Sequence, residues 1–394
     1  MSTTKDLDRL LQHFVDEKEL PGAALSVCRG EEVLYESYCG HQDIERRKPL
    51  TADTLFRIHS ITKVFSSLCG MMEFERGSFQ MDDPVYEFLP EYKNMKVCVR
   101  RPDGALSVED SKVPMRMQDL FNMRVGFYAH DGSPTEHGLK EAHDRLGGSK
   151  FLSDYDQRTE IRALADVPML FEPGTHWQYG YGINIMAVVV EVVSGKPISQ
   201  YMQEKIFDPL DMKDTGFRFR PGWRERLAEC VKHLPDGSVA PCDDVLGDPL
   251  DAPYREEAAY EAADCGLISS LRDVQVFSGM LANGGVWKGE RLIGRKTIDM
   301  MRQNPQTAQL TKEFHDFMPE MIGYAYGYGV RTLIDPVKGM CNGSVGEFGW
   351  CGAAGPWMMA DPSERLSAAF MIQDMLPDYR YYCNPLRAAI NGLL

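Results

Sequence analysis

The chain has 394 residues, of which 43% are hydrophobic, so it is long and apolar enough to bury a large core. Its formal net charge is −15, from 43 basic and 58 acidic residues, and this argues against nucleic acid or an anionic membrane surface as a partner. The longest apolar run, from Ile183 to Val193, is too short to cross a bilayer. The composition therefore indicates a soluble protein with no membrane association.

The predicted elements begin with an amphipathic helix over Leu7–Val15, followed by strands over Ala23–Cys28 and Glu32–Tyr38 that a tight turn joins into a hairpin. From Ser60 to Phe217 the pattern is mostly helix and loop, with proline and glycine marking the breaks. Strand patterns return late in the chain, over Tyr326–Leu333, Gly355–Ala360 and Leu366–Ile372. A final helix is predicted over Pro385–Leu394. This order predicts a sheet built from both chain ends around a helical insertion.

Cysteine usage and the first residues predict a cytoplasmic location. The ten cysteines are scattered and form no Cys-x-x-Cys pair, so we expect reduced thiols rather than a disulfide framework or a zinc site. The N-terminus lacks the apolar core of a secretion signal. Neither a Walker loop nor a dinucleotide-binding glycine pattern occurs, and no histidine spacing matches a known metal motif. We therefore expect no cofactor and no metal.

The pair Ser60 and Lys63 is the first candidate for chemistry. A serine and a lysine three residues apart lie on one face of a helix, where the lysine amine can take the serine proton. Such a pair is typical of acyl transfer through a serine ester. The spacing also arises by chance, and Ser60 occupies a place suited to a helix N-cap, because apolar residues recur at helical spacing from Ile61 and Gly77 is a suitable helix end. Both interpretations stay open on this motif alone.

Seven segments carry a wider resemblance: Leu55–Lys63, Met81–Val85, Phe88–Pro90, Phe171–Thr175, Tyr179–Tyr181, Ile206–Met212 and Gly349–Gly352. The sequences of these segments and their order along the chain resemble those of the class C β-lactamase-like superfamily of serine hydrolases, which has the penicillin-binding-protein fold. That superfamily includes β-lactamases, D-alanyl-D-alanine peptidases, and a branch of carboxylesterases and acyltransferases. The matching segments span nearly the whole chain.

The resemblance implies an α/β (α+β) fold of the β-lactamase/transpeptidase type, with an antiparallel sheet flanked by helices plus a mostly helical subdomain. It implies one catalytic domain over residues 1–394. Within this domain, residues 1–75 and 220–394 are expected to form the sheet-containing part and residues 76–219 the mainly helical part. The active site is expected in the groove between the two parts.

The second candidate is Tyr179, whose surroundings resemble the Tyr-x-Asn motif of the family. A tyrosine hydroxyl beside a lysine can share the proton taken from Ser60 and return it to the leaving group. Tyr181 stands where the motif has asparagine, and this departure disfavours β-lactam chemistry. Tyr181 is the alternative proton-transfer residue, and both tyrosines also suit simple packing at the edge of a groove.

The third candidate is Trp350, which stands where β-lactamases and peptidases of the family carry the first residue of Lys-Thr-Gly or His-Thr-Gly. The esterase branch carries Trp-Gly-Gly there, so the chain resembles that branch more closely. A tryptophan offers apolar stacking area instead of a cation for a substrate carboxylate, which favours neutral, partly apolar acyl esters. Arg124 or Arg331 remains a candidate for binding an anion, and a buried tryptophan that anchors the sheet is the alternative. Cys351 has no nearby base in the sequence that would make it a reactive thiol.

The tetrahedral intermediate of an acyl-enzyme reaction needs an oxyanion hole. By resemblance, the backbone N–H groups of Ser60 and Ala353 supply it. Aromatic residues near the motifs are candidates for binding the substrate: Phe127, Tyr128, Tyr181, Trp350 and Trp357.

The sequence thus predicts a serine hydrolase acting on small carboxylic esters through a Ser60 acyl-enzyme, with Lys63 and Tyr179 as the proton-transfer pair. The absence of a Gly-x-Ser-x-Gly elbow argues against the α/β-hydrolase route to the same reaction. An acyltransferase that passes the acyl group to an alcohol or amine is the main alternative. A β-lactamase, a D-alanyl peptidase and a non-catalytic ligand-binding scaffold are less favoured. The natural substrate and the oligomeric state are not encoded in any motif.

Overall fold

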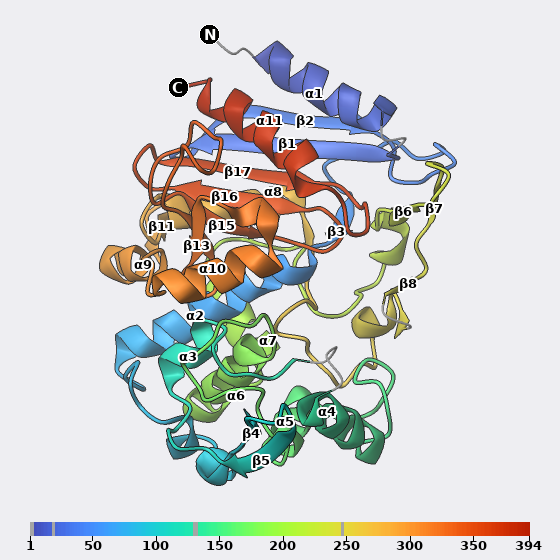
Figure 1. Ribbon diagram of the computed structural model, residues 1–394. Coiled ribbons are helices and arrows are strands. Elements are labelled where there is room, and N and C mark those ends of the chain that lie inside the picture. Colours follow the sequence, from blue (N-terminus) through green and yellow to red (C-terminus); the bar gives the residue numbers. More distant parts are fainter. Residues whose placement is uncertain (1–3, 18–19, 129–132, 246–247) are drawn as a thin grey trace.

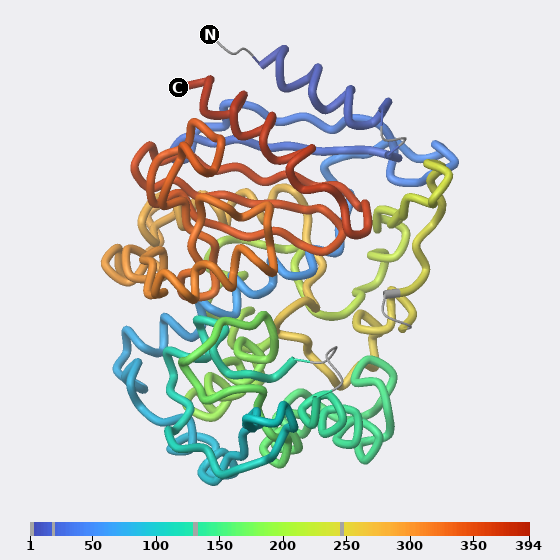
Figure 2. The backbone as a smooth tube through the Cα atoms, viewed as in Figure 1, coloured from blue at the N-terminus to red at the C-terminus, as the bar shows by residue number. Residues whose placement is uncertain are grey.

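The fold is described from a computed structural model, which describes residues 4–17, 20–128, 133–245 and 248–394. The molecule has two stacked parts, a sheet with its covering helices and a mainly helical part (Figure 1). The backbone trace shows that both ends of the chain lie on the same side of the molecule, beside the sheet (Figure 2). The sheet is therefore assembled from segments far apart in sequence.

The main sheet has seven antiparallel strands in the order β13-β14-β15-β16-β17-β1-β2. Their bounds are β1 Gly22–Arg29, β2 Glu32–Gly40, β13 Tyr324–Tyr326, β14 Arg331–Leu333, β15 Phe348–Cys351, β16 Trp357–Asp361 and β17 Leu366–Met371. Strand β1 pairs with β17 from Ala24 opposite Met371 to Arg29 opposite Leu366, and this pairing joins the two chain ends.

Helices cover both faces of this sheet. Alternate residues of a strand point to opposite faces, and in β17 Ser367 accepts a hydrogen bond from Gln275 of α8 (Leu271–Ala282), whereas the ring of Phe370 packs on Phe14 of α1 (Thr4–Glu17). Helix α11 (Tyr379–Asn391) lies beside α1 (Figure 1). The central strands are therefore buried on both faces, which explains their nearly continuous apolar sequence.

The helical part is built around α2 (Thr62–Arg76) and α6 (Gly182–Ser194), which pack against each other. Gly70 allows the close approach, because a Cβ there would lie 2.5 Å from the sulfur of Met186. Gly77 ends α2 in a left-handed conformation with φ of 80°, as the sequence predicted. The other α-helices between residues 76 and 219 are α3 Met117–Phe121, α4 Pro134–Arg145, α5 Gln157–Leu164 and α7 Ile198–Met202. Two more, α9 Arg295–Met301 and α10 Ala308–Phe317, belong to the later part of the chain, and α10 contacts β13 of the sheet.

Short strand pairs complete the described structure. Their bounds are β3 Leu55–Arg57 with β10 Ile268–Ser270, β4 Lys96–Arg100 with β5 Leu106–Asp110, β6 Val231–His233 with β7 Val239–Pro241, β8 Asp244–Val245 with β9 Asp248–Pro249, and β11 Val286–Trp287 with β12 Glu290–Arg291. Strand β3 precedes the turn His59–Ile61 and α2, and β10 lies directly before α8, so the pairing of β3 with β10 connects the segments that lead into the two helices.

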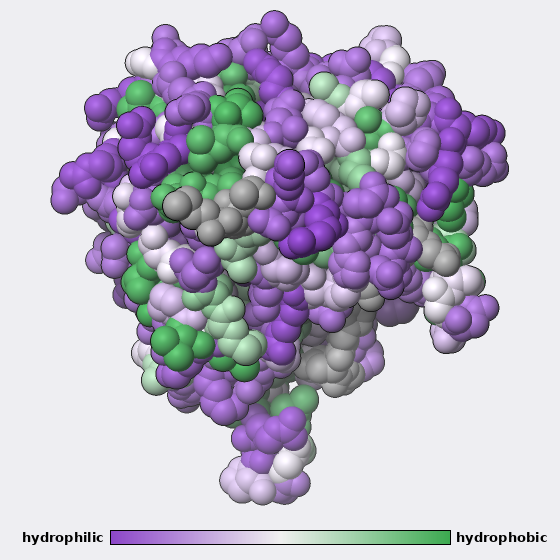
Figure 3. All heavy atoms as spheres, turned by 90° about the horizontal axis from the view of Figure 1, so that it is seen from above, coloured by the Kyte–Doolittle hydropathy of each residue, from purple (hydrophilic) through white to green (hydrophobic). Residues whose placement is uncertain are grey.

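Seen from the side of α1 and α11, the surface is mostly polar with scattered apolar patches (Figure 3). No single helix of the described segments is both long and apolar enough to cross a bilayer; α6 together with Ile198–Phe207 meets the length and composition test only as a pair bent by 76°.

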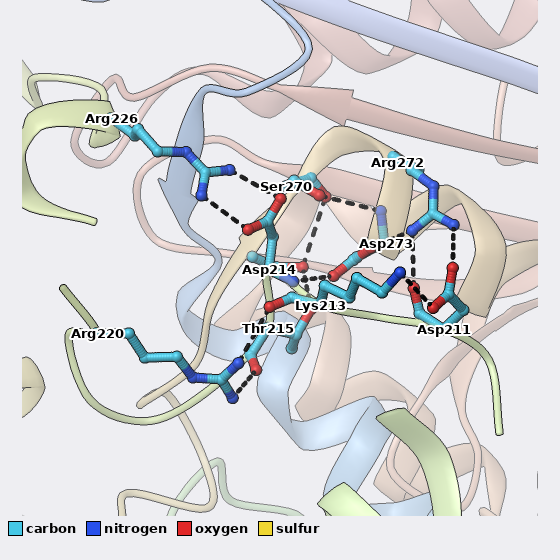
Figure 4. A network of polar contacts seen from close by, with 10 residues as sticks. Asp211, Lys213, Asp214, Thr215, Arg220, Arg226, Ser270, Arg272 and Asp273 are labelled. Carbon is cyan, nitrogen blue, oxygen red and sulfur yellow. Dashed lines mark hydrogen bonds and ion pairs between the residues drawn. The ribbon is translucent and has the colours of Figure 1, made fainter. Parts of the chain in front are cut away.

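A polar network fastens the segment after α7 to the start of α8 (Figure 4). Thr215 donates to the carboxylate of Asp273 at 2.9 Å, and Asp214 forms an ion pair with Arg226 at 2.8 Å. Ser270 caps α8 by accepting the Asp273 backbone N–H at 3.2 Å. The network therefore ties the segment after α7 to α8, the helix that contacts β17 of the sheet.

Most predicted elements are confirmed, with two corrections. The predicted strand Tyr326–Leu333 is a hairpin, because Gly329 turns the chain at a φ of 78° and separates β13 from β14. The last helix begins at Tyr379, where the Asp378 side chain caps it, so Pro385 lies inside the helix rather than at its start. The β4–β5 hairpin inside the helical part was not predicted.

Candidate active site

A cavity of about 450 Å³ brings together segments from all along the chain. Seven of the residues predicted from sequence line it: Ser60, Lys63, Phe127, Tyr128, Tyr179, Tyr181 and Ala353. Residues 59–63 come from the 3₁₀ turn His59–Ile61 and the start of α2, residue 353 follows β15, and residues 127–128 and 179–181 come from loops of the helical part. The predicted catalytic residues thus share one site.

Ser60 and Lys63 are neighbours, as their spacing predicts. Ser60 lies in a 3₁₀ turn over His59–Ile61, and Lys63 lies in the first turn of α2. The Lys63 ammonium donates to Ser60 Oγ at 3.2 Å and to the backbone carbonyl of Asp264 at 2.8 Å. The helix-cap interpretation of Ser60 is wrong, because α2 has Ile61 at its N-cap position and no side-chain cap.

The backbone before Ser60 is in an unusual conformation. His59 has a φ of 43°, which non-glycine residues rarely adopt and which costs on the order of 1 kcal/mol. Its side chain is buried, and its Nε2 has no hydrogen-bond partner in the described segments. Burial, with Arg57 and Lys63 nearby, lowers the pKa of His59 to about 3. His59 is therefore a very weak base, and among the described residues it is Lys63, not His59, whose side chain is hydrogen-bonded to Ser60 Oγ.

Lys63 is a buried cation with a carboxylate beside it. Its Nζ lies 3.7 Å from Asp264 Oδ2, and its side chain is only 3% exposed. Burial alone would lower the pKa of Lys63, but Tyr179 and Asp264 outweigh burial and the pKa is raised. Burial likewise opposes ionisation of Asp264, but Lys63 and Lys150 hold its pKa at about 2. In this arrangement Lys63 is an ammonium that donates to Ser60.

Tyr179 lies next to the same ammonium. Lys63 Nζ is 4.7 Å from the centre of the Tyr179 ring, and the Tyr179 hydroxyl accepts a hydrogen bond from Trp350 Nε1 at 3.3 Å. Gly180 permits this placement, because a Cβ there would lie 2.1 Å from the carbonyl oxygen of Phe127. The structure therefore favours Tyr179 over Tyr181 as the partner of Lys63.

Tyr181 points to a different group. Its hydroxyl donates to Glu160 Oε1 at 3.3 Å, and the same fully buried carboxylate accepts from Tyr260 and contacts His143 Nε2 at 2.7 Å. Tyr181 lines the cavity as predicted, but as a member of this Glu160 network.

Two backbone N–H groups lie free at the cavity. Within the described residues, the N–H groups of Ser60 and Ala353 have no hydrogen-bond acceptor. Gly352 brings their segments together, because a Cβ there would lie 2.3 Å from the carbonyl oxygen of Ile58. The Gly352 carbonyl also accepts from Tyr379 Oη at 2.5 Å, which fixes the end of β15. This arrangement suits an oxyanion hole.

Comparison with known proteins identifies the family. The family model described as Beta-lactamase matches residues 7–392. The chain belongs to the Beta-lactamase family. Esterase EstB of Burkholderia gladioli is 28% identical over 377 residues, which cover 93% of this chain and 89% of EstB. The resemblance predicted from the sequence is thereby confirmed.

Solved structures confirm the fold as well. EstCE1, described as a hydrolase with promiscuous acyltransferase activity, superposes with a TM-score of 0.80 at 22% identity and covers 98% of both chains. Simvastatin synthase (LovD) from Aspergillus terreus superposes with a TM-score of 0.82 at 20% identity, covering 100% of this chain and 99% of LovD. The β-lactamase/transpeptidase-like fold predicted from the sequence is therefore present.

Two tryptophans expected in the substrate pocket of this Beta-lactamase family member do not line the cavity. Trp350 is 1% exposed and stacks behind Tyr179 with ring centres 6.0 Å apart, so it supports that tyrosine and offers no free stacking surface. Trp357 is also 1% exposed and lies against the guanidinium groups of Arg331 and Arg387. For Trp350, the alternative of a buried anchor is the better description.

The two arginines expected to bind an anion lie outside the cavity lining. Arg331 is fully buried and donates to Glu347 at 2.8 Å. Arg124 is buried with its Nε 3.6 Å from Asp119.

Burial raises the pKa of Cys351 to about 12, so its thiol stays protonated and unreactive at neutral pH.

Sequence reasoning missed three charged residues of the site, namely Lys150, Glu160 and Asp264. They come from a loop, from α5 and from the segment before β10. Only tertiary folding brings Lys150 and Asp264 to the cavity wall and places Glu160 behind it, on the hydroxyl of Tyr181. A charge inside the small, apolar stretch Ala262–Gly266 is the one available signal for Asp264.

In the described segments no group of three or more His, Cys, Asp and Glu side chains is arranged to hold a metal ion, and all ten cysteines are unpaired.

Proposed function

We propose that the protein is a serine hydrolase that cleaves carboxylic esters of small molecules through an acyl-enzyme on Ser60, with Lys63 and Tyr179 as the proton-transfer pair. One observation carries the proposal: Lys63 Nζ is hydrogen-bonded to Ser60 Oγ and adjacent to the Tyr179 ring inside one cavity. Membership of the Beta-lactamase family and the esterase name of EstB support a serine enzyme that acts on esters.

The protonation state of the Lys63–Tyr179 pair determines how Ser60 is activated. Because the pKa of Lys63 is raised, the pair holds its proton at neutral pH, and only the form that has lost one proton can accept another. In that form Ser60 Oγ bonds to the ester carbonyl carbon while its proton moves to the Lys63–Tyr179 pair. As the ester C–O bond breaks, the proton passes to the leaving alkoxide. Water then repeats the sequence, and the carboxylic acid leaves.

The remaining roles follow from positions around Ser60. The N–H groups of Ser60 and Ala353 would receive the carbonyl oxygen as it becomes negative, since neither has another acceptor in the described segments. Phe127, Tyr128 and Tyr181 are the proposed pocket aromatics, because all three line the cavity. Trp350 donates its indole N–H to the Tyr179 hydroxyl and so orients that hydroxyl.

The expected location and division into parts belong to the same proposal. Unpaired cysteines throughout the chain support a reducing compartment, the cytoplasm. The division into residues 1–75 with 220–394 and residues 76–219 is supported by a sheet drawn from both chain ends, although α2, which begins at Thr62, packs on α6 of the helical part.

Ester turnover tests the proposal directly. The 4-nitrophenyl esters of acetate, butyrate and octanoate would be offered to the wild type, to Ser60→Ala, and to Ser149→Ala as the control, because Ser149 lines the same cavity. We expect at least one ester to be turned over by the wild type and by Ser149→Ala, with a loss of about a thousandfold or more in Ser60→Ala. Equal rates for the wild type and Ser60→Ala would refute the proposal.

Acyl transfer is the second candidate, because the same acyl-enzyme can meet an alcohol or amine before water. Adding a primary alcohol to the assay separates the two outcomes. A transferase forms the new ester at a rate that grows with the alcohol and without loss of nitrophenol release. A hydrolase releases free acid at every alcohol concentration.

A further inference from the structure

Lys150 is a second cation at the cavity, on the loop between α4 and α5. Its ammonium lies over three aromatic rings, with Nζ 5.3 Å from the centre of Phe151, 5.1 Å from Tyr181 and 5.2 Å from Tyr260. Unlike Lys63, it has neither a hydrogen-bond acceptor nor a carboxylate within 4 Å in the described part of the chain. Its ammonium N–H groups are therefore left for another acceptor.

The aromatic cage around Lys150 is held by a buried carboxylate. Glu160 is fully buried and accepts the hydroxyls of Tyr181 and Tyr260, so both rings are fixed from behind. His143 contacts the same carboxylate at 2.7 Å. The buried Glu160 carboxylate needs these hydrogen-bond donors, because a buried charge without them would destabilise the fold. The two tyrosine rings of the cage are therefore held in fixed positions.

The carboxylates nearest to Lys150 are occupied by other donors. Besides Glu160, Asp264 pairs with Lys63 and accepts from Asn184 at 2.9 Å. Asp248 also lines the cavity, where it accepts from Ser149 at 2.7 Å and lies beyond 4 Å from Lys150. These groups balance the positive charge of the site at longer range, but none supplies a direct partner for the Lys150 ammonium.

We propose that Lys150 binds a carboxylate on the substrate, so that the esters cleaved at Ser60 carry an anionic group. A charge-assisted hydrogen bond in a partly desolvated cavity is strong, and the three rings keep the ammonium in place for it. This proposal rests on the proposed function and refines its substrate class. It replaces the expectation of neutral esters, which followed from the lack of a cation at position 350. The cation comes from another segment of the chain.

Matched ester pairs test the proposal. Each pair has the same length and differs by a carboxylate in place of a methyl group: 4-nitrophenyl valerate against the 4-nitrophenyl monoester of glutaric acid for the acyl side, and 4-methylphenyl acetate against 4-acetoxybenzoate for the alcohol side. The measured quantity is the ratio of kcat/KM for the anionic ester to kcat/KM for its neutral partner. The variants are Lys150→Met, Lys150→Arg, and Lys140→Met, which removes an equal charge from the exposed face of α4.

We expect the ratio for at least one pair to fall about ten- to hundredfold in Lys150→Met, mainly through KM, and to be largely retained in Lys150→Arg. Lys140→Met should leave the ratio unchanged. A ratio that is the same in the wild type and Lys150→Met for both pairs would overturn the proposal, provided that thermal melting shows the variant to be folded.

Binding without turnover separates this proposal from the proposed function. Calorimetric titration of Ser60→Ala with each anionic ester measures binding directly, and the double variant Ser60→Ala/Lys150→Met measures the share of Lys150. If no ester is turned over but Lys150 strengthens binding of an anionic ester tenfold, the proposed function fails and the carboxylate site stands. If esters are turned over through Ser60 and Lys150 changes neither ratio nor binding, the carboxylate site fails alone.

Discussion

Replacement of Asp264 by asparagine tests the electrostatic basis of Ser60 activation. The carboxylate lies 3.7 Å from Lys63 Nζ and raises the pKa of that lysine. The backbone carbonyl of residue 264, which accepts from Lys63 at 2.8 Å, is retained in Asp264→Asn, so the lysine keeps its position and loses only a neighbouring charge.

The size of the effect follows from the distance. Two unit charges 3.7 Å apart interact by about 4 kcal/mol at an effective dielectric constant of about 20, which corresponds to about three pH units. Solvent that reaches the pair screens the interaction and reduces this value, because the Asp264 side chain is 21% exposed. We expect the pKa of Lys63 to fall by about one to three units in Asp264→Asn.

The pH profile of kcat/KM is the measurement. Because the reactive form has lost a proton, activity should rise with pH in the wild type, and the rising limb should move to lower pH in Asp264→Asn. Asp248→Asn is the matched control, since Asp248 lines the same cavity without pairing with Lys63. A limb that stays in place in Asp264→Asn, or moves to higher pH, would contradict the assigned proton state of Lys63.

Three further substitutions probe the supports of the site. Trp350→Phe removes the indole N–H that Tyr179 accepts at 3.3 Å, and we expect kcat/KM to fall about fivefold to tenfold with KM nearly unchanged; an unaltered kcat would contradict this role. Gly352→Ala should lower activity at least tenfold in a folded protein, because its methyl would meet a backbone carbonyl at 2.3 Å; retained activity would place the oxyanion hole elsewhere. Glu347→Gln leaves the fully buried Arg331 without its carboxylate, and urea unfolding should show a loss of about 3 kcal/mol; a loss below about 1 kcal/mol would refute the importance of this ion pair.

Local features were predictable from the sequence because they depend on neighbouring residues. Ser60 and Lys63 are three residues apart, so helical geometry alone brings them together. The β1–β2 hairpin and the end of α2 at Gly77 follow from alternation and glycine in the same way. Tyr179 needed the family resemblance, because only tertiary folding places it over Lys63.

The features that sequence reasoning missed depend on long-range packing. Trp350 was expected to face the substrate, but the position of β15 places it behind Tyr179 instead. Lys150 and Asp264 come from segments more than a hundred residues apart, and no motif marks either one. The turn at Gly329 was hidden because residues that favour strands, such as Tyr326, Val330 and Thr332, lie on both sides of it.

The proposed reaction depends on acylation of Ser60. The most direct measurement is the mass of the intact protein after a brief incubation with 4-nitrophenyl butyrate, quenched in acid and followed by peptide mapping. We expect an added butyryl group on the peptide that contains Ser60 in the wild type, and no added group in Ser60→Ala. An adduct that persists in Ser60→Ala, or maps to another residue, would show that Ser60 is not the nucleophile.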